Sequence, residues 1–356
     1  MSQHRSKCFT KKINLYFYKK GIQFLPFFTF KENGSILLSS DKIRKLLSMI
    51  SIAMATYNGE KNIKEQIESI LNQTLKEFEL IICDDASTDN TVPILTSFAE
   101  KDKRIKILKN EQNLGFKKNF EKILSHCTGE YIAFCDQDDI WFPNHLEVLY
   151  NIISKGNYDA VGANSILVNS NNSELGYTLL DMQDIGFIPK TQQEYKTLLL
   201  HKNIFQGTAM MISKSILNKA LPFPENIKFH DWWIALIATE NKGVYYDKTP
   251  ILRYRQHESN VTENKPSTFG CKIKQFLTCK FNRRKLSVIN ILENFYNTST
   301  STNKKEIQDA LLYAKRYERK SPLIIPHYIK HKKYLHKNQN SLIFSIRILK
   351  RLLGLY

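Results

Sequence analysis

Five apolar runs of strand length constrain the fold of this chain more than any other feature. They occupy residues 49–56, 79–83, 105–108, 131–135 and 161–168. Between them lie segments with apolar residues at helical spacing, as at Ile63, Ile67 and Ile70. Strands that alternate with helices in this way predict an α/β fold with a mostly parallel, doubly wound sheet and helices on both of its faces.

Further helix and strand signals surround these runs. Pro93 suits the first turn of a helix, and residues 116–124 are predicted to form the next one. Farther along, residues 205–212 are typical of a strand entered through a glycine, and residues 230–238 of a buried helix. Residues 253–260 (RYRQHESN) have no clear periodicity, so no element is predicted there.

Polar residues stand at the carboxyl ends of three of the predicted strands. They are Thr56, Tyr57 and Asn58 at the first strand, Asp84 and Asp85 at the second, and Asp136, Asp138 and Asp139 at the fourth. In a parallel sheet these ends share one edge, and ligands bind there. We therefore expect residues that are far apart in the sequence to meet at one site.

The cluster Asp136, Asp138 and Asp139 points to a divalent metal ion. Three carboxylates within four residues repel one another unless a cation lies between them. Carboxylate oxygens suit Mg²⁺ or Mn²⁺, which take one or two protein carboxylates and complete their shell with phosphate oxygens and water. An acidic surface turn is the alternative for the cluster taken alone, but Asp84 and Asp85 could accept hydrogen bonds from a base or ribose. Together the two clusters predict a nucleotide-diphosphate site.

Several other classes of site are not supported. The sequence contains neither GxGxxG nor GxxxxGK[ST], so no dinucleotide-binding motif or P-loop is predicted and the phosphates must be held mainly by the metal. Its six cysteines include no CxxC pair, which fits a chain in the reducing cytosol rather than a disulfide scaffold. No apolar stretch reaches the 18 or so residues that span a bilayer.

Charge divides the chain into basic ends and a mildly acidic middle. Residues 271–356 hold 19 Lys and Arg against 4 Asp and Glu, residues 1–48 hold 10 against 2, and residues 49–270 account for −5 of the net +18. The ends are expected to meet an anionic partner, although solubilising tails are an alternative. In residues 342–353 an apolar face opposes Arg347, Lys350 and Arg351. This pattern predicts a basic helix lying on the anionic inner membrane, or a helix packed on the domain.

The motifs taken together identify a family. Residues 50–91 (ISIAMATYNGEKNIKEQIESILNQTLKEFELIICDDASTDNT) and residues 113–141 (NLGFKKNFEKILSHCTGEYIAFCDQDDIW) strongly resemble family 2 glycosyltransferases of the GT-A fold. The later HDWW and RYRQHESN segments resemble rhamnosyltransferase-like bacterial members that build surface polysaccharides such as O-antigen or capsule. The resemblance implies a catalytic domain over residues 49–265, a basic extension over 1–48 and a basic helical region over 266–356.

The resemblance also implies roles for individual residues. Thr56, Tyr57 and Asn58 would line the nucleotide, one or both of Asp84 and Asp85 would hold the base and ribose, Asp136 and Asp138 would form the DxD motif, and His257 would be a further metal or pyrophosphate contact. Asp138 is the expected metal ligand and Asp231 the expected general base. Each has a plainer alternative: Asp231 as a helix cap, His257 as a structural imidazole, and the neighbouring Trp232 and Trp233 as core rather than as a sugar platform.

Three departures from the family pattern stand out, since the sequence has DDAS where DDGS is commoner, Gln137 within the DxD motif, and His230 where Glu is frequent. The QxxRW motif of processive synthases is absent, which implies transfer of one sugar per encounter. The expected enzyme moves that sugar, with inversion, from a nucleotide-diphosphate donor to a carbohydrate or lipid-linked acceptor at the cytoplasmic face of the membrane. A nucleic-acid-binding protein and a non-catalytic membrane scaffold are the rivals; the acidic middle would repel nucleic acid.

Overall fold

The computed structural model describes residues 30–31, 35–36, 50–183, 185, 187–256, 284–301, 304–319, 321, 323 and 325–335. Contacts within the chain divide it into two compact units, Met1–Leu47 and Ser48–Tyr356. In the first unit, β1 (Phe30–Lys31) pairs antiparallel with β2 (Ser35–Ile36). The other features lie in the second unit.

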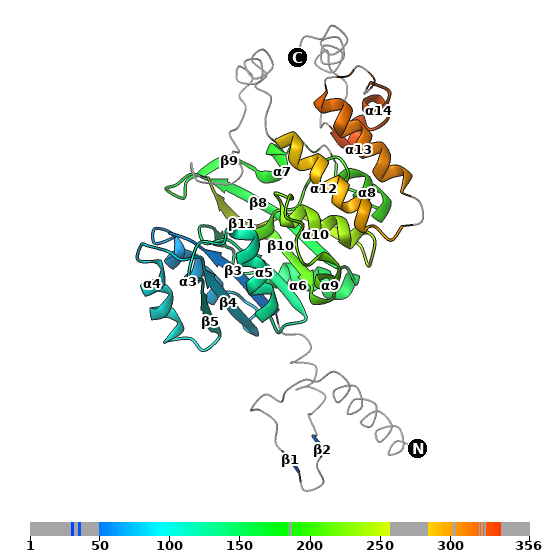
Figure 1. Cartoon of the computed structure of the whole chain (residues 1–356). Helices are drawn as coiled ribbons and strands as arrows, with labels where there is room; N and C mark the ends of the chain where they lie inside the picture. Colours follow the sequence, from blue (N-terminus) through cyan, green and yellow to red (C-terminus); the bar gives the residue numbers. More distant parts are fainter. Residues whose placement is uncertain are drawn as a thin grey trace. The chain divides into compact units, whose positions relative to one another are not determined.

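A nine-stranded sheet forms the centre of the second unit (Figure 1). Its strands are β3 (Ile50–Thr56), β4 (Phe78–Asp84), β5 (Ile105–Lys109), β6 (Tyr131–Cys135), β7 (Ile140–Trp141), β8 (Ala160–Val168), β9 (Glu174–Thr178), β10 (Met210–Ser213) and β11 (Val244–Arg255). They lie in the order β5-β4-β3-β6-β10-β8-β11-β7, with β9 paired to β8. Six strands point one way, and β7, β9 and β10 run against them, so the sheet is mostly parallel as predicted.

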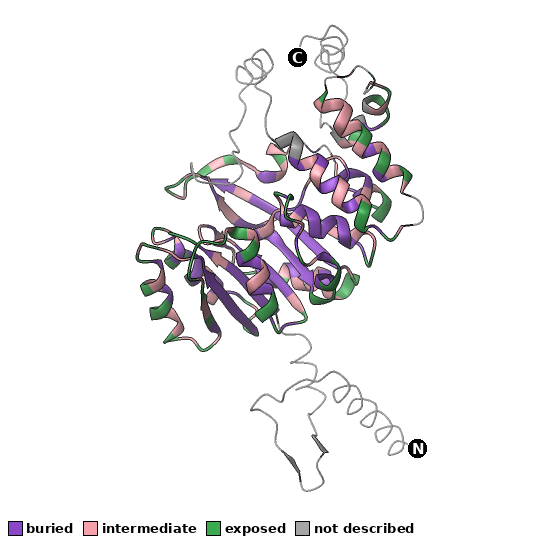
Figure 2. Cartoon of the chain, in the orientation of Figure 1, coloured by how far each residue is buried: buried purple, intermediate pink, exposed green. Residues whose placement is uncertain are grey.

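Helices cover both faces of this sheet. Between β3 and β11 these helices are α3 (Ile63–Leu71), α4 (Thr91–Ala99), α5 (Phe116–His126), α6 (His145–Gly156), α7 (Leu179–Met182), α8 (Gln192–Leu199), α9 (Leu217–Ala220) and α10 (His230–Thr239). Alternate residues of β3 point to opposite faces: Ala53 packs in a core with α5 and α10, whereas Ile52 and Met54 pack in another with α3, α4 and α6. Figure 2 shows the buried strands between these layers. The sheet is therefore doubly wound.

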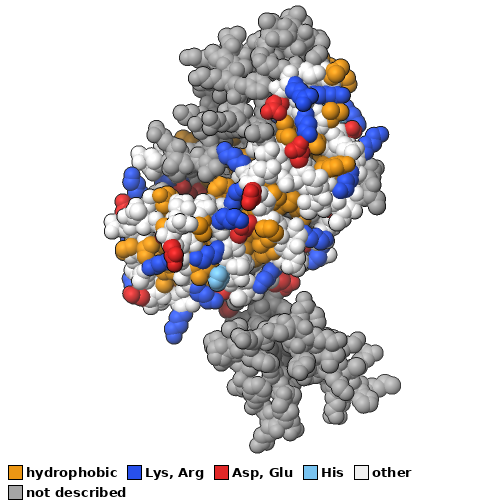
Figure 3. All heavy atoms as spheres, viewed as in Figure 1, with side chains coloured by type: hydrophobic (Ala, Val, Ile, Leu, Met, Phe, Trp, Pro, Cys, Tyr) orange, Lys and Arg blue, Asp and Glu red, His pale blue; other side chains and the backbone are white. Residues whose placement is uncertain are grey.

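After β11, the described part of the chain consists of helices and short connecting segments. Its helices are α12 (Arg284–Thr298), α13 (Lys305–Glu318), α14 (Ile325–Lys330) and α15 (Lys332–Leu335). α12 packs on α13 and on α10, and Phe295 of α12 and Ile307 of α13 are fully buried in the same core as Trp233 (Figure 1). On the face in Figure 3, Lys and Arg side chains are interspersed with Asp and Glu across the described surface. The basic segment 342–353 lies outside the described residues.

The five apolar runs all form strands, but two predictions need correction. The strand expected over 205–212 begins only at Met210, because Gly207–Ala209 form a 3-10 turn. RYR at residues 253–255 ends β11, a twelve-residue strand that was not predicted. Register shifts on both sides of Pro250 interrupt the alternation that would have revealed it. No described helix is long and apolar enough to cross a membrane.

Candidate active site

The loop after β3 is fastened to the loop after β6 through one glutamine. Tyr57 N donates to Gln137 Oε1 at 2.9 Å, and Gln137 Nε2 donates back to Tyr57 O at 3.0 Å. The variable DxD position therefore sets the spacing between these two loops. The Tyr57 side chain itself is 46% exposed, so its ring is accessible at the edge of the sheet.

Asp84 organises the turn in which it lies. Its carboxylate accepts from Thr56 Oγ1 at 3.0 Å, Ser87 N at 2.8 Å and Ser87 Oγ at 2.6 Å. Ala86 has φ of +64°, the left-handed region that favours glycine, which explains why DDGS would be the easier sequence here. Asn58 lies on the same turn, because its amide N–H donates to Ser87 Oγ and its Oδ1 accepts from Thr88 N, both at 2.9 Å.

Asp85 holds the segment that leads into α5. Its Oδ1 accepts from Asn110 Nδ2 at 2.7 Å and from Leu114 N at 2.9 Å, and its Oδ2 accepts from Gly115 N at 2.9 Å. A carboxylate has about four acceptor positions, so three are in use here as they are at Asp84. Both residues thus position loops around the edge of the sheet. Direct contact with a base or ribose stays a prediction for either one.

Asp136, Asp138 and Asp139 follow β6 directly, as predicted. Burial, followed by the charges of Asp138 and Asp231, raises the pKa of Asp136 to about 7. Burial also raises the pKa of Asp139 well above its ordinary range, and the charges of Asp138 and Asp136 add to this. Among the described residues, the buried Oδ2 of Asp139 has no hydrogen-bond partner. An all-oxygen cluster with excess negative charge and an unpaired buried oxygen fits Mg²⁺ or Mn²⁺.

Asp231 lies in the first turn of α10 and reaches the same cluster from almost a hundred residues away. Its charge is one of the causes that raise the pKa of Asp136, so the two carboxylates are close in space. Its Oδ1 accepts from Trp232 N at 2.6 Å, and this bond, the Asn203 side chain and the Gly207 N–H act to lower its pKa. Burial nevertheless raises the pKa of Asp231 to about 6. The side chain is partly exposed, which suits a group that exchanges a proton with a ligand.

The neighbours of Asp231 are core residues. Trp232 Nε1 donates to Leu199 O at 2.7 Å and Trp233 Nε1 to Ala220 O at 2.9 Å, and both side chains are at least 95% buried. Neither indole is free to stack on a sugar ring, so of the two alternatives the core role is correct. His230 lies against the rings of Phe116, Phe120, Phe134 and Phe223, and burial lowers its pKa to about 4. It is a neutral core residue.

Arg255, at the end of β11, supports the acidic loop and was missed from the sequence. Its Nε donates to Asp138 O at 2.9 Å, its backbone N to Asp139 Oδ1 at 3.2 Å, and its guanidinium to Glu65 Oε2 at 2.6 Å and Ser170 O at 2.9 Å. The Arg255 side chain is only 5% exposed. One cation thus joins α3, the β8–β9 turn and the loop after β6. His257, two residues later, lies outside the described residues, and its proposed metal contact stays a prediction.

Replacing Arg255 by Met is expected to lower the free energy of unfolding by about 3 kcal/mol, because the carbonyl oxygens of Asp138 and Ser170 and the half-exposed carboxylate of Glu65 lose a charged donor. Urea denaturation followed by circular dichroism measures this. Arg253→Met is the matched control on the same strand: its 3.4 Å pair with Glu174 joins side chains that are 37% and 52% exposed, so the expected change is about 0.5 kcal/mol or less. Equal small changes in both variants would show that Arg255 does not anchor the loop.

Comparison with known proteins supports this fold and identifies a family. The model of the family described as Glycosyl transferase family 2 matches residues 51–221. The Escherichia coli enzyme named UDP-Glc:alpha-D-GlcNAc-diphosphoundecaprenol beta-1,3-glucosyltransferase WfgD is 32% identical over 219 residues, which cover 61% of this chain and 81% of that protein. The dTDP-rhamnosyl transferase RfbG of Shigella flexneri is 30% identical over 220 residues, covering 58% and 72%.

A solved structure shares the architecture. The crystal structure of S. aureus TarS 1-349 in complex with UDP-GlcNAc superposes with a TM-score of 0.52 at 19% identity, covering 81% of this chain and 88% of that one. An α/β sheet with acidic loops at its carboxyl edge, together with these matches, defines the class as a GT-A glycosyltransferase. The chain belongs to glycosyltransferase family 2, and the expectation drawn from its motifs is confirmed.

Proposed function

We propose that this glycosyltransferase moves one sugar, with inversion, from a nucleotide-diphosphate donor to a carbohydrate or lipid-linked acceptor in bacterial surface-polysaccharide synthesis. One observation carries the proposal: a partly exposed carboxylate, Asp231, lies beside the acidic cluster of Asp136 and Asp138 and has a pKa raised to about 6. A base needs a pKa near the working pH to accept a proton and still be ionised. The cluster beside it suits the diphosphate end of a donor.

These positions suggest separate roles for the acidic cluster and for Asp231. Asp138, with Asp136, would hold Mn²⁺ or Mg²⁺, which when bound offsets the charge that develops on the departing diphosphate. Asp231 takes the proton of the acceptor hydroxyl on a carboxylate oxygen while the hydroxyl oxygen bonds to the anomeric carbon and the bond from that carbon to the diphosphate breaks. Tyr57, whose ring is exposed, and its neighbours Thr56 and Asn58 would line the nucleotide.

The names of the relatives support this substrate class. WfgD is named for a UDP-glucose donor and a diphosphoundecaprenol-linked acceptor, RfbG for a dTDP-rhamnosyl donor, and the TarS structure contains UDP-GlcNAc. All three donors are nucleoside diphosphates joined to a hexose, a deoxyhexose or an N-acetylhexosamine. We therefore infer a donor of that class for this chain, with rhamnose or another hexose as the transferred sugar.

The experiment that tests the proposed function is a panel of UDP-, GDP- and dTDP-sugars incubated with the full chain. Release of nucleoside diphosphate from one donor, with Mn²⁺ or Mg²⁺ and not with EDTA, is the expected result. Stimulation by a lipid-linked or saccharide acceptor, with one sugar added, supports the acceptor class. Salt-sensitive binding to nucleic acid without turnover of any donor would favour the nucleic-acid-binding rival, and inert binding to membranes would favour the scaffold.

The basic segment near the carboxyl end is proposed to hold the enzyme at an anionic membrane where lipid-linked acceptors lie. Each Lys or Arg near such a surface contributes about 1 kcal/mol, so removing residues 341–356, with Arg347, Lys350 and Arg351, is expected to weaken binding to anionic vesicles by about 100-fold. Co-sedimentation with phosphatidylglycerol vesicles measures this, with phosphatidylcholine vesicles as the control. If the shortened protein sediments as before, another part of the chain makes the contact.

A further inference from the structure

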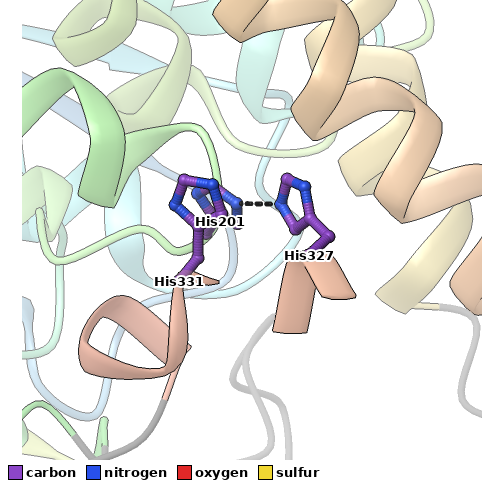
Figure 4. Close-up of side chains that lie close together, drawn as sticks. All are labelled: His201, His327 and His331. Carbon is purple, nitrogen blue, oxygen red and sulfur yellow. Dashed lines mark hydrogen bonds between the residues drawn. The ribbon is translucent and has the colours of Figure 1, made fainter. Parts of the chain in front are cut away.

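Three histidines from distant parts of the sequence meet outside the candidate active site. His201 follows α8, His327 lies in α14 and His331 follows α14 (Figure 4). One ligand atom from each lies within 4.8 Å of the others. Among the described residues, no other group of three or more His, Cys, Asp or Glu side chains is gathered as closely. His327 and His331 are four residues apart, the spacing that puts two side chains on one helical face.

Hydrogen bonding fixes the tautomer of the central imidazole. His201 Nδ1 lies 2.8 Å from Thr197 O, and a carbonyl oxygen can only accept, so Nδ1 carries the hydrogen and Nε2 is an acceptor. His201 Nε2 therefore accepts a hydrogen bond from His327 Nε2–H at 2.8 Å, and a metal ion would take the place of that hydrogen. An imidazole whose other nitrogen donates to a backbone carbonyl is the usual arrangement of a metal-bound histidine. The lone pair of His201 thus points at the other histidines.

The surroundings keep the three rings neutral and closely packed. Burial lowers the pKa of His201 to about 4 and that of His327 to about 3, and the pKa of His331 is also lowered. The His327 ring stacks on Tyr313, with ring centroids 4.5 Å apart, and lies tilted against His331, with centroids 4.3 Å apart. Among the described residues, the buried Nδ1 of His331 has no hydrogen-bond partner. Neutral imidazoles are the form that binds metals.

Nearby charges are mixed rather than repulsive to a cation. The charge of Glu306 acts to raise the pKa of His201 and of His331, and the charge of Asp309 acts to raise that of His331. Lys330 and Arg316 act in the opposite direction on the pKa of His327. Glu306 is itself held against α8, because it accepts from Thr197 Oγ1 at 2.6 Å and from Gln193 Nε2 at 2.8 Å. It is therefore positioned to balance charge near the histidines without being required as a ligand.

From this geometry we propose that His201, His327 and His331 form a binding site for a divalent transition-metal ion of the zinc class, which fastens α14 to the end of α8. Imidazole nitrogens suit Zn²⁺, Ni²⁺ or Co²⁺, whereas the oxygen cluster of the active site suits Mg²⁺ or Mn²⁺, so the two sites take different metals. Nitrogens around a tetrahedral Zn²⁺ lie roughly 3.3 Å apart. The 2.8 Å separation of His201 Nε2 and His327 Nε2 must therefore widen by about 0.5 Å, and ligand atoms as far apart as 4.8 Å must approach by about 1.5 Å. Movement of α14 allows this, because its residues Pro326, Ile329 and Lys330 are exposed.

The metal would add to contacts that already join these segments, since Tyr334 of α15 packs against the hydrophobic core and against the ring of Phe187. Besides the histidines, α15 meets α8 through the 2.7 Å pair of Lys333 with Glu194, whose side chains are 45% and 27% exposed. Exposed pairs of this kind contribute about 1 kcal/mol or less. A metal held by residues 201, 327 and 331 would link parts of the chain that are more than a hundred positions apart in the sequence. It is thus expected to strengthen the docking of α14 and α15.

The test is a titration of the full chain, stripped with chelator and desalted, with Zn²⁺ against a chromophoric chelator. One Zn²⁺ per chain is expected to bind, and His327→Gln and His331→Gln are each expected to weaken binding by about 100-fold or more. Asp138→Ala should keep the site, because that residue belongs to the other cluster. His126→Gln, a change at an exposed histidine on α5, is the matched control and should bind as the parent does.

Two further readouts keep the test decisive if a variant is poorly folded. Zn²⁺ at 100 times its Kd should raise the Tm of the parent by about 5 °C, with no shift in His331→Gln. Hydrogen exchange of residues 325–335 should slow when Zn²⁺ is added to the parent. Equal Zn²⁺ affinity in the parent and both histidine variants, loss of the ion in Asp138→Ala alone, or unchanged exchange in α14 would each overturn the proposal.

Discussion

Asp138→Ala is expected to lower kcat for sugar transfer by about 1,000-fold or more, because the departing diphosphate loses the cation that offsets its charge. Asp138 is the expected metal ligand of the cluster after β6, and its neighbours Asp136 and Asp139 already have raised pKa values. The remaining carboxylates cannot replace it without moving. Steady-state rates across Mn²⁺ and Mg²⁺ concentrations measure the loss, which added metal should not restore.

The same variant should fold at least as stably as the parent. Repulsion from Asp138 helps to raise the pKa of Asp136 from 3.8 to about 7. A carboxyl group with a raised folded pKa stabilises the protein below about pH 4 and loses that contribution as pH rises to about 7. At pH 8 without metal, removing Asp138 relieves this repulsion, so Tm should be equal or higher.

The matched control for Asp138→Ala is Asp102→Ala. Asp102 lies just before β5, at the amino end of that strand and so away from the carboxyl ends where the acidic loops lie, and it pairs with Arg104 at 2.7 Å. Its removal is expected to leave transfer near the parental rate. Comparable losses in both variants would mean that the Asp138 effect comes from the fold rather than from the site.

Asp231→Asn is expected to lower kcat by about 100- to 10,000-fold, the range for losing a general base, with little change in donor affinity. The amide keeps the shape of the side chain but cannot take the acceptor proton. Measuring kcat with saturating acceptor, and donor Kd separately, distinguishes loss of chemistry from loss of binding. Near-normal turnover would show that another group removes the proton.

The pH dependence gives a second test of Asp231. The base must be ionised, and its pKa is raised to about 6, so the rate of the parent should fall about tenfold for each pH unit below that value. It should level off above pH 7. Asp231→Asn should lack this acid limb over the range in which the protein stays folded. An identical limb in the variant would assign it to another group.

The parallel half of the sheet could be predicted from sequence because its strands are buried on both faces. Such strands appear as continuous apolar runs, as ISIAMAT and FELIICD do at β3 and β4. β11 could not be predicted, because half-exposed charged residues and the irregularity near Pro250 hide its period. The antiparallel course of β10 depends on which neighbours it meets, and no local pattern carries that information.

The site residues also divide into those that a local sequence pattern reveals and those that depend on contacts between distant parts of the chain. Acidic residues at strand ends reveal the site, since the end of a strand is a local property. The contacts by which Arg255 supports the acidic loop could not be predicted from the sequence, because its partner Glu65 lies 190 residues away. Likewise the HxxxH spacing of His327 and His331 offers a signal for two of the three clustered histidines, but their meeting with His201 exists only in the folded chain.

The measurement that tests the central claim most directly is calorimetric titration of the donor's nucleoside diphosphate, with and without Mn²⁺, into the parent, Asp138→Ala and Asp231→Asn. The parent and Asp231→Asn should bind it with the same Mn²⁺-dependent affinity, although only the parent transfers sugar. Asp138→Ala should lose the gain from Mn²⁺. If Asp138→Ala keeps that gain, or Asp231→Asn loses it, then the cluster after β6 and the carboxylate of α10 do not divide metal binding and proton transfer between them.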